Sequence, residues 1–154
     1  MNPIEALLKT NGNVAPLIAR VTLGVVMFPH GAQKALGWFG GHGFSPTMNS
    51  FTTHMHIPAL FAFLAIAAEF AGSLGLVTGF LSRLSAFGIA VNMLVAIAMA
   101  HASNGFFMNW MGNQKGEGFE YHLLAIGLAL IVIIFGGGKA SIDRLLSGRP
   151  AANN

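Results

Sequence analysis

Residues 58–80 read PALFAFLAIAAEFAGSLGLVTGF, an apolar run interrupted by a single acidic side chain, Glu69. A helix needs about 20 consecutive apolar residues to cross the hydrocarbon core of a bilayer, and this run is long enough. The proline at its start is tolerated because the amide hydrogen that proline lacks has no partner in the first turn of a helix. The stretch therefore predicts a membrane-spanning helix with a carboxyl group near its middle.

The composition of the whole chain agrees with a membrane protein. Only 8% of its 154 residues are charged and 54% are apolar, whereas an ordinary soluble domain has about 25% charged residues. Such a chain has too few polar side chains to cover a soluble fold, and it is too apolar to be disordered. Its length allows one domain. We therefore expect residues 1–154 to form a single membrane domain.

Three further runs have the length and the composition of membrane spans. With the first run they predict an all-α integral membrane protein, a bundle of four transmembrane helices at about residues 14–36, 58–80, 83–102 and 119–135. The connections inside the two helix pairs are longer, at about residues 37–57 and 103–118, and the connection between the pairs is short. An even number of spans places both termini on one side of the membrane and the two longer loops on the other.

Basic and aromatic residues indicate which side is which. Basic residues concentrate on the cytoplasmic side of membrane proteins, and tryptophan and tyrosine concentrate at the interfaces. The termini and the short loop contain Lys9, Arg83, Lys139, Arg144 and Arg149, whereas the other side has Lys34 and Lys115. Both termini are therefore predicted to be cytoplasmic. We interpret Lys9, Arg83 and the tail bases as topology signals and nothing more, and Trp38, Trp110 and Tyr121 as an outer interfacial belt.

Small residues recur along the second span at positions that lie on one side of a helix. They are Ala68, Gly72, Gly75 and Gly79. Lipid is as apolar as leucine, so membrane helices associate by close backbone approach at small side chains rather than by burying an apolar stripe. The pattern predicts a helix-packing surface, used inside the bundle or in a homodimer, and we favour the use inside the bundle.

Several classes of function are excluded at this stage. The chain has no cysteine, which excludes disulfides, thiol catalysis, iron–sulfur clusters and covalently attached haem. Its net charge is +3, with eight Lys and Arg residues scattered along the chain, and no basic stripe suggests a nucleic-acid partner. The bilayer is the expected surrounding, together with a protein partner or further copies of the chain.

Two charged residues lie inside predicted spans, where a charge costs about 2.5–3.5 kcal/mol on insertion scales. Arg20 lies in the first span and Glu69 in the second, and their levels differ by roughly 5–10 Å if the spans begin at equal depth. An extended arginine side chain bridges such a distance. We predict a structural ion pair between Arg20 and Glu69, and the alternative role for Glu69 is a proton carrier at mid-depth.

A second polar group lies at the outer ends of the helices. His30 and Lys34 are one helical turn apart, His101 ends the third span, and Glu120 and His122 begin the fourth. A quinone or another small organic substrate suits this layer, because its carbonyl oxygens accept hydrogen bonds from His and Lys, and its reduction requires protons that His and Glu can transfer.

The expected roles and their alternatives follow from this layer. We expect His30, Lys34 and His101 to bind quinone, and Glu69, Glu120 and His122 to act as catalytic proton-transfer residues. A metal ion or a haem held by two histidines is an alternative, although the spacing gives no metal-ligand signature and we assign no metal site. A further alternative is that these histidines lie at the membrane interface and merely contact water. The remaining histidines, in the first outer loop, are interpreted as solvated: His42, His54 and His56.

The order of these motifs resembles the DoxX family. The first span contains Arg20, then Leu-Gly, then His30-Gly-Ala-Gln-Lys34, and the second contains Glu69-Phe-Ala-Gly followed by Gly79-Phe-Leu-Ser-Arg. Glu120-Tyr-His resembles the entry of that family's fourth helix, and Gly136-Gly-Gly with Ser141-Ile-Asp resembles its closing segment. Family-matching polar positions are Arg20, His30, Lys34, Glu69, Glu120 and His122, and His101 rests on its depth alone.

The resemblance implies a small four-helix protein of the bacterial inner membrane, in a family linked to quinol oxidases, to thiosulfate:quinone oxidoreductase and to oxidative-stress assemblies. We therefore expect a membrane subunit of a quinone-linked oxidoreductase system, with quinone as its ligand. The alternative is a non-catalytic docking or assembly subunit of a redox or stress-response complex. A transporter is a third reading, and it requires an oligomer because four helices leave little room for a channel.

Overall fold

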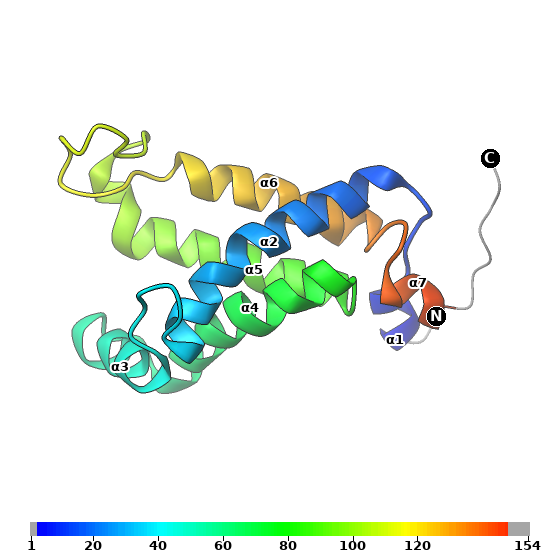
Figure 1. Ribbon diagram of the computed structural model, residues 1–154, viewed down its shortest axis with the longest axis horizontal. Coiled ribbons are helices and arrows are strands. Elements are labelled where there is room, and N and C mark those ends of the chain that lie inside the picture. The colour runs from blue at the N-terminus through cyan, green and yellow to red at the C-terminus, as the bar shows by residue number, and fades with distance from the viewer. Residues whose placement is uncertain (1–2, 148–154) are drawn as a thin grey trace.

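The computed structural model describes residues 3–147, and every regular element in this part of the chain is a helix (Figure 1). Three short elements are not α-helical: η1 and η2 are π-helical turns and η3 is a 3-10 turn. In chain order the elements are α1 (Pro3–Leu8), α2 (Val14–Leu36), α3 (Phe44–Asn49), η1 (Ser50–His54), α4 (Ala59–Thr78), α5 (Ser82–Ala96), η2 (Ile97–His101), η3 (Ala102–Asn104), α6 (Glu120–Phe135) and α7 (Ile142–Leu146).

Four long helices form an elongated bundle. α2 packs against α4 and α6, and α5 packs against the same two helices. The short helices α1 and α7 lie together at one end of this bundle, whereas α3 and the loop before α6 lie at the opposite end (Figure 1). We call the first end the α1/α7 end and the second the loop end. The chain therefore runs along the bundle axis four times.

The helix boundaries agree closely with the apolar runs. α2 and α4 coincide with the first two predicted spans, and each ends at a glycine with positive φ, at Gly37 and Gly79, a conformation that glycine adopts at low cost. The third predicted span continues through both η turns to Asn104. Three helical stretches, 14–36, 59–78 and 82–104, are long and apolar enough to cross a membrane.

Two features differ from the expectation: the length of α6, and the helical content of the first outer loop. α6 has only 16 residues, which corresponds to about 24 Å of helix, and it is shorter than the three candidate spans. Residues 37–57, predicted as a loop, contain α3 and η1, so two short helical elements cover part of the loop end.

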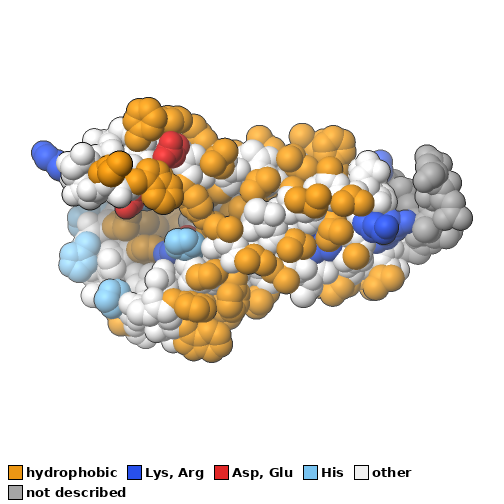
Figure 2. All heavy atoms as spheres, turned by 45° about the horizontal axis from the view of Figure 1, so that its top comes forward, with side chains coloured by type: hydrophobic (Ala, Val, Ile, Leu, Met, Phe, Trp, Pro, Cys, Tyr) orange, Lys and Arg blue, Asp and Glu red, His pale blue; other side chains and the backbone are white. Residues whose placement is uncertain are grey.

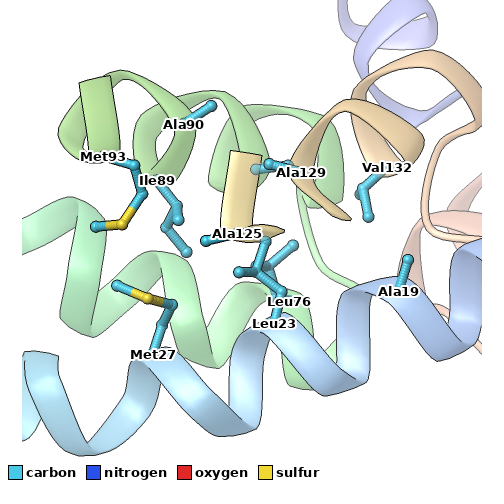
Figure 3. Close-up of a cluster of buried hydrophobic side chains, with 11 residues drawn as sticks. Ala19, Leu23, Met27, Leu76, Ile89, Ala90, Met93, Ala125, Ala129 and Val132 are labelled. Atoms are coloured by element: carbon cyan, nitrogen blue, oxygen red, sulfur yellow. The ribbon is translucent and has the colours of Figure 1, made fainter. Parts of the chain in front are cut away.

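The apolar core lies between the four long helices (Figure 3). It is built mainly from small and flexible side chains, and none of its members is more than 7% exposed. They are Ala19, Leu23, Met27, Leu76, Ala86, Ile89, Ala90, Met93, Ala125, Ala129 and Val132. Large apolar residues such as Phe61 and Leu124, by contrast, are 61% and 71% exposed on the outer surface of the bundle. This inverted distribution suits a helix bundle whose surroundings are lipid.

Small residues set the distances between the helices. A Cβ added to Gly31 of α2 would lie 2.6 Å from backbone atoms of Phe70, and one added to Gly24 would lie 2.9 Å from the carbonyl oxygen of Ser73. On the other side of α4, a Cβ on Gly72 would make ordinary contact with Ile89 of α5 at 3.6 Å. The small residues of α4 therefore pack inside the bundle, as predicted.

Arg20 joins three segments at the α1/α7 end of the bundle. Its side chain is 1% exposed, and its guanidinium, which has five N–H donors, donates to five backbone carbonyl groups. Two acceptors lie in the last turn of α4, where carbonyl groups lack intrahelical partners and the helix dipole favours a cation. The acceptors are the oxygens of Leu76, Val77, Gly137, Lys139 and Ala140, at 2.6 to 3.4 Å.

The predicted ion pair between Arg20 and Glu69 is wrong. Contacts of Gly31 with Glu69 and Phe70 place Glu69 at the level of Gly31, which is eleven residues, or about 16 Å, along α2 from Arg20. The depth estimate failed because it assumed that both spans begin at the same level. Instead α4 extends farther toward the loop end than α2 does, since close packing at glycine fixes the register of the two helices.

Two further charged residues tie helix ends together at the α1/α7 end. The carboxylate of Asp143, 1% exposed, accepts hydrogen bonds from the amides of Leu81 and Ser82 at 2.7 and 2.8 Å and so caps the start of α5. The guanidinium of Arg83 donates to the carbonyl groups of Lys9, Ile133 and Ile134. Arg83 is therefore more than a topology signal, because it binds the last turn of α6.

Candidate functional site

A cavity of about 1500 Å³ opens at the loop end of the bundle. Figure 2 shows a hollow at this end, with histidine side chains gathered around it and charged groups inside. Its floor is the apolar core, because Met27 and Met93 belong to both. We call the polar part of this cavity the polar chamber. Its side chains come from five elements: His30 and Lys34 of α2, Glu69 of α4, Asn92 of α5, His101 of η2, and Tyr121 and His122 of α6.

An ion pair between α2 and α4 forms one wall of the chamber. Nζ of Lys34 lies 2.5 Å from Oε2 of Glu69, and Nδ2 of Asn92 donates to Oε1 of the same carboxylate at 2.8 Å. The Glu69 side chain is 7% exposed and that of Lys34 is 27% exposed. One carboxylate oxygen therefore accepts a hydrogen bond and the other faces the ammonium group, which is partly exposed.

The opposite wall is a pair of histidines from η2 and α6. The ring centroids of His101 and His122 are 4.2 Å apart. Nδ1 of His101 lies 2.8 Å from the carbonyl oxygen of Glu117, so this nitrogen carries a proton and donates. His122 is 6% exposed, and its Nδ1 is buried without a hydrogen-bond partner. A buried polar atom without a partner is costly, and this one belongs to a residue that lines the cavity.

Tyr121 links the histidines of α2 and α6. Its ring centroid lies 6.2 Å from that of His30 and 5.5 Å from that of His122. Its hydroxyl group donates to the sulfur of Met27 at 3.3 Å. Three ring systems from two helices therefore lie in sequence across the chamber, above its apolar floor.

The structure brings together five of the six residues for which we predicted binding or catalysis. His30, Lys34, Glu69, His101 and His122 all border the cavity. Glu120 is not among the lining residues, and its Oε1 accepts a hydrogen bond from the amide of Met108 at 3.0 Å. Glu120 begins α6 on a helix face that points toward the preceding loop, so the structure gives it the role of anchoring that loop.

Several lining residues were not predicted from the sequence, and three of them have a polar ring or an amide side chain. His56, interpreted as solvated, lines the cavity from the first outer loop, and Tyr121, interpreted as part of an interfacial belt, lies inside the chamber. Asn92 was overlooked, although an amide side chain within an apolar span is itself a signal. The roles of His56 and Tyr121 depend on loop and helix orientation, which residue type does not specify.

Among the residues that the structure describes, no three histidine or acidic side chains are grouped closely enough to hold a metal ion. The carboxylate of the chamber is already neutralised by Lys34. The donor set thus offers N–H and ammonium groups to an acceptor ligand.

The comparisons with known proteins agree with this architecture. The sequence model of the DoxX family matches residues 15–102. The chain is similar to inner membrane protein YqjF of Escherichia coli (strain K12), with 28% identity over 88% of this chain and 94% of the relative. It is also similar to an uncharacterized protein of Haemophilus influenzae, with 30% identity over 86% of this chain and 83% of the relative. No solved structure matches the chain.

The matched region contains α2, α4 and α5 up to residue 102, and so includes His30, Lys34, Glu69, Asn92 and His101. Three apolar helices of spanning length and the similarity to an inner membrane protein place the chain in the bacterial inner membrane as a multi-pass protein. The chain belongs to the DoxX family.

Proposed function

We propose that this protein is a membrane subunit of a quinone-linked oxidoreductase system and that it binds a quinone head group in the polar chamber. The observation that carries the proposal is the buried, unpartnered Nδ1 of His122, a residue that lines the same cavity as the Lys34–Glu69 ion pair. A ligand atom next to this nitrogen would remove its desolvation penalty.

The chemistry of the chamber suits a ring with two opposed carbonyl oxygens. The Lys34 ammonium group and the imidazole of His30 on α2, and the imidazole of His122 on α6, can donate hydrogen bonds, and the walls between them are mostly apolar. Pockets for small organic ligands have this character, with a few placed polar groups in an apolar cavity. Tyr121 and Met27 supply the ring and sulfur contacts that an aromatic or quinoid ring favours.

Reduction of a quinone to a quinol consumes two electrons and two protons. Imidazole groups can accept and donate protons at the chamber, and Glu69 of α4 is the carboxylic acid of the chamber. The chain itself contains no cysteine to bind an iron–sulfur cluster. In this proposal the electrons come from a partner subunit or a donor substrate that docks at the loop end.

The proposed topology has four spans with both termini in the cytoplasm. α6 packs between α2 and α5 along the bundle and returns the chain to the α1/α7 end (Figure 1). The described basic residues Lys9, Arg83, Lys139 and Arg144 belong to that end, while Arg149 lies outside the described residues. Positive residues on one side support a cytoplasmic α1/α7 end, which places the polar chamber toward the outer surface.

The test is a quinone analysis of the purified protein. The detergent-purified protein is extracted with organic solvent, and quinone is quantified per chain in the wild type and in a His30→Ala, His122→Ala variant. A His42→Ala, His54→Ala variant is the matched control, because it also loses two histidines, and both are exposed and neither lines the cavity.

We expect near-stoichiometric quinone in the wild type and in the control, and at least about a tenfold loss in the chamber variant, equivalent to about 1.4 kcal/mol. Quinone no higher than in an unrelated four-helix membrane protein would contradict the proposal. Equal quinone in all three proteins would contradict the position of the site.

A second candidate function, docking or assembly without catalysis, is favoured by the outer loop before α6. This loop exposes large apolar side chains, with Phe107 at 67%, Trp110 at 83% and Met111 at 86%. Exposed apolar clusters of this kind mark contact sites for proteins or membranes. Substitution of Trp110 by serine would then abolish partner capture while leaving the quinone content unchanged, whereas the chamber variant would show the opposite pattern.

A further inference from the structure

We infer that the ligand of the polar chamber carries a long prenyl tail, which lies in a lipid-facing groove between α4 and α5 and by which the ligand enters sideways from the bilayer. The inference rests on the proposed function and deepens it, because it separates tailed quinones dissolved in the membrane from short, water-soluble ones. It also assigns a binding surface to a part of the molecule outside the polar chamber.

The first observation is the extent of the cavity. It continues from the chamber along α4 and α5 as far as Thr78 and Phe80, near the α1/α7 end. Its volume of about 1500 Å³ exceeds the usual range of about 300–1,000 Å³ for small-molecule pockets. A ring bound beside His122 would fill only the polar part of this space.

The second observation is the shape of the extension. Small residues of the two helices form its floor, where α4 and α5 approach closely: a Cβ added to Gly88 would lie 3.2 Å from Cβ of Ala68. The floor consists of Ala68, Gly72, Gly75, Ser85 and Gly88. Apolar side chains that are 41–57% exposed form its rims, namely Leu64, Leu74, Leu84, Phe87, Val91 and Val95.

The third observation is what lies at the end of this groove. Asn92 of α5 binds the carboxylate of Glu69 at the boundary between the small-residue floor and the polar chamber, and His122, more than nine-tenths buried with an unpartnered Nδ1, borders the same cavity. A polar head at this end and an apolar chain along the groove match the two chemistries of the cavity. From Ala65 to Thr78 the groove accompanies α4 for about 20 Å.

The rims of this groove face lipid, so the tail stays in contact with the bilayer while the head reaches the chamber. Because lipid is as apolar as the rims, the groove contributes close packing and direction rather than a hydrophobic driving force. A substitution that fills the groove from the lipid side should therefore act on tailed ligands and leave the chamber intact.

The experiment compares two probes in lipid nanodiscs: a tail-less benzoquinone, and the same ring with a long prenyl tail. The variant is Ala71→Trp, since Ala71 is exposed and borders the groove. The control is Gly127→Trp on α6, where an added Cβ meets nothing within 4 Å and which lies outside the cavity. Each probe partitions into the nanodisc lipid to the same extent whichever protein is present. The ratio of a variant's affinity to that of the wild type therefore reports the effect of the groove.

We expect Ala71→Trp to weaken binding of the tailed quinone about tenfold, while tail-less binding and both affinities of Gly127→Trp stay within about twofold of wild type. An unchanged tailed affinity in Ala71→Trp would overturn the inference, as would equal losses for both probes. If Ala71→Trp lost copurified phospholipid but bound both quinones as the wild type does, the groove would hold lipid rather than a quinone tail, and the inference would also be overturned. Failure of both probes to bind wild type would instead contradict the proposed function.

Discussion

Lys34 and Glu69 illustrate how a charged pair persists within an apolar bundle. The Glu69 carboxylate is almost fully buried, with one oxygen 2.5 Å from the lysine nitrogen and the other bonded to Asn92. Removing one member of a buried pair leaves an uncompensated charge, which costs more than removing both. The two residues should therefore behave as one unit when they are substituted.

This behaviour can be measured in a double-mutant cycle. Lys34→Met and Glu69→Gln should each lower the free energy of unfolding, and the double variant should lose less than the sum of the two. We expect a coupling energy of about 0.5–3 kcal/mol, the range for residues in direct contact, measured by denaturation in a fixed detergent.

A second cycle provides the control. Arg20→Lys and Glu69→Gln should add within about 0.5 kcal/mol, because residues more than about 10 Å apart without shared partners are independent, and Arg20 binds only carbonyl groups at the α1/α7 end. Coupling between Arg20 and Glu69 as large as that between Lys34 and Glu69 would contradict the register of α2 and α4.

At the residue scale, the sequence identified polar groups but not their partners. Residue type and depth marked Arg20 and Glu69 as unusual in apolar helices, and Lys34 and three outer histidines border one cavity as expected. Partner choice failed for Arg20 because it depends on helix register, which a few glycine contacts determine. The acceptors of Arg20 are backbone carbonyl groups, which every residue has, so the sequence does not indicate which of them Arg20 binds.

At the scale of the elements, glycine has two opposite roles in the long helices. Gly31 of α2 is buried against the backbone of α4, where an added Cβ would lie 2.6 Å from atoms of Glu69 and Phe70. Gly127 of α6 faces open space and is exposed. The same substitution should therefore have opposite effects at the two positions.

We expect Gly31→Ala to destabilise the bundle by about 1–3 kcal/mol through overpacking. Gly127→Ala should stabilise it by about 0.5–1 kcal/mol, because glycine is a poor helix former. Thermal unfolding of both variants in the same detergent checks the signs. Equal effects of the two variants would show that α2 and α4 are not in close contact at Gly31.

Helix positions followed from the apolar runs, because a spanning helix must satisfy its backbone polar groups internally over its whole length. α2 and α4 therefore lie where they were expected. The π-helical turn Ile97–His101 has no comparable signal, yet such turns often occur at functional sites, and here it ends at His101. At the start of α6, the amides of Phe119 and Glu120 donate hydrogen bonds to the carbonyl oxygens of Gly105 and Phe106, so the preceding loop is joined to the first residue of the helix.

For the whole molecule, the absence of cysteine makes the proposed topology directly testable. Single cysteines are introduced at Asn13, beside α2 at the α1/α7 end, and at Asn113, in the outer loop, both exposed. In intact cells a membrane-impermeant maleimide should label the Asn113→Cys protein, and label the Asn13→Cys protein only after permeabilisation.

The cysteine-free parent is the control for background labelling in the same cells. Labelling of both variants without permeabilisation would mean that the chain crosses the membrane an even number of times between residues 13 and 113, so that α2, α4 and α5 do not all span it. The reversed pattern would place the polar chamber on the cytoplasmic side and would move the expected docking site of the electron donor with it.

The carbonyl cluster around Arg20 also bears on how the chain is made. A ribosome delivers α2 to the translocon long before residues 137–140, which supply three of the five acceptors, have been synthesised. Until then the guanidinium has no complete set of partners and must stay hydrated at the membrane surface, with its long side chain reaching water. The first helix therefore reaches its final depth only after the last helix and the turn that follows it have been synthesised. The N-terminal part of the chain completes its insertion after the C-terminal part has been made.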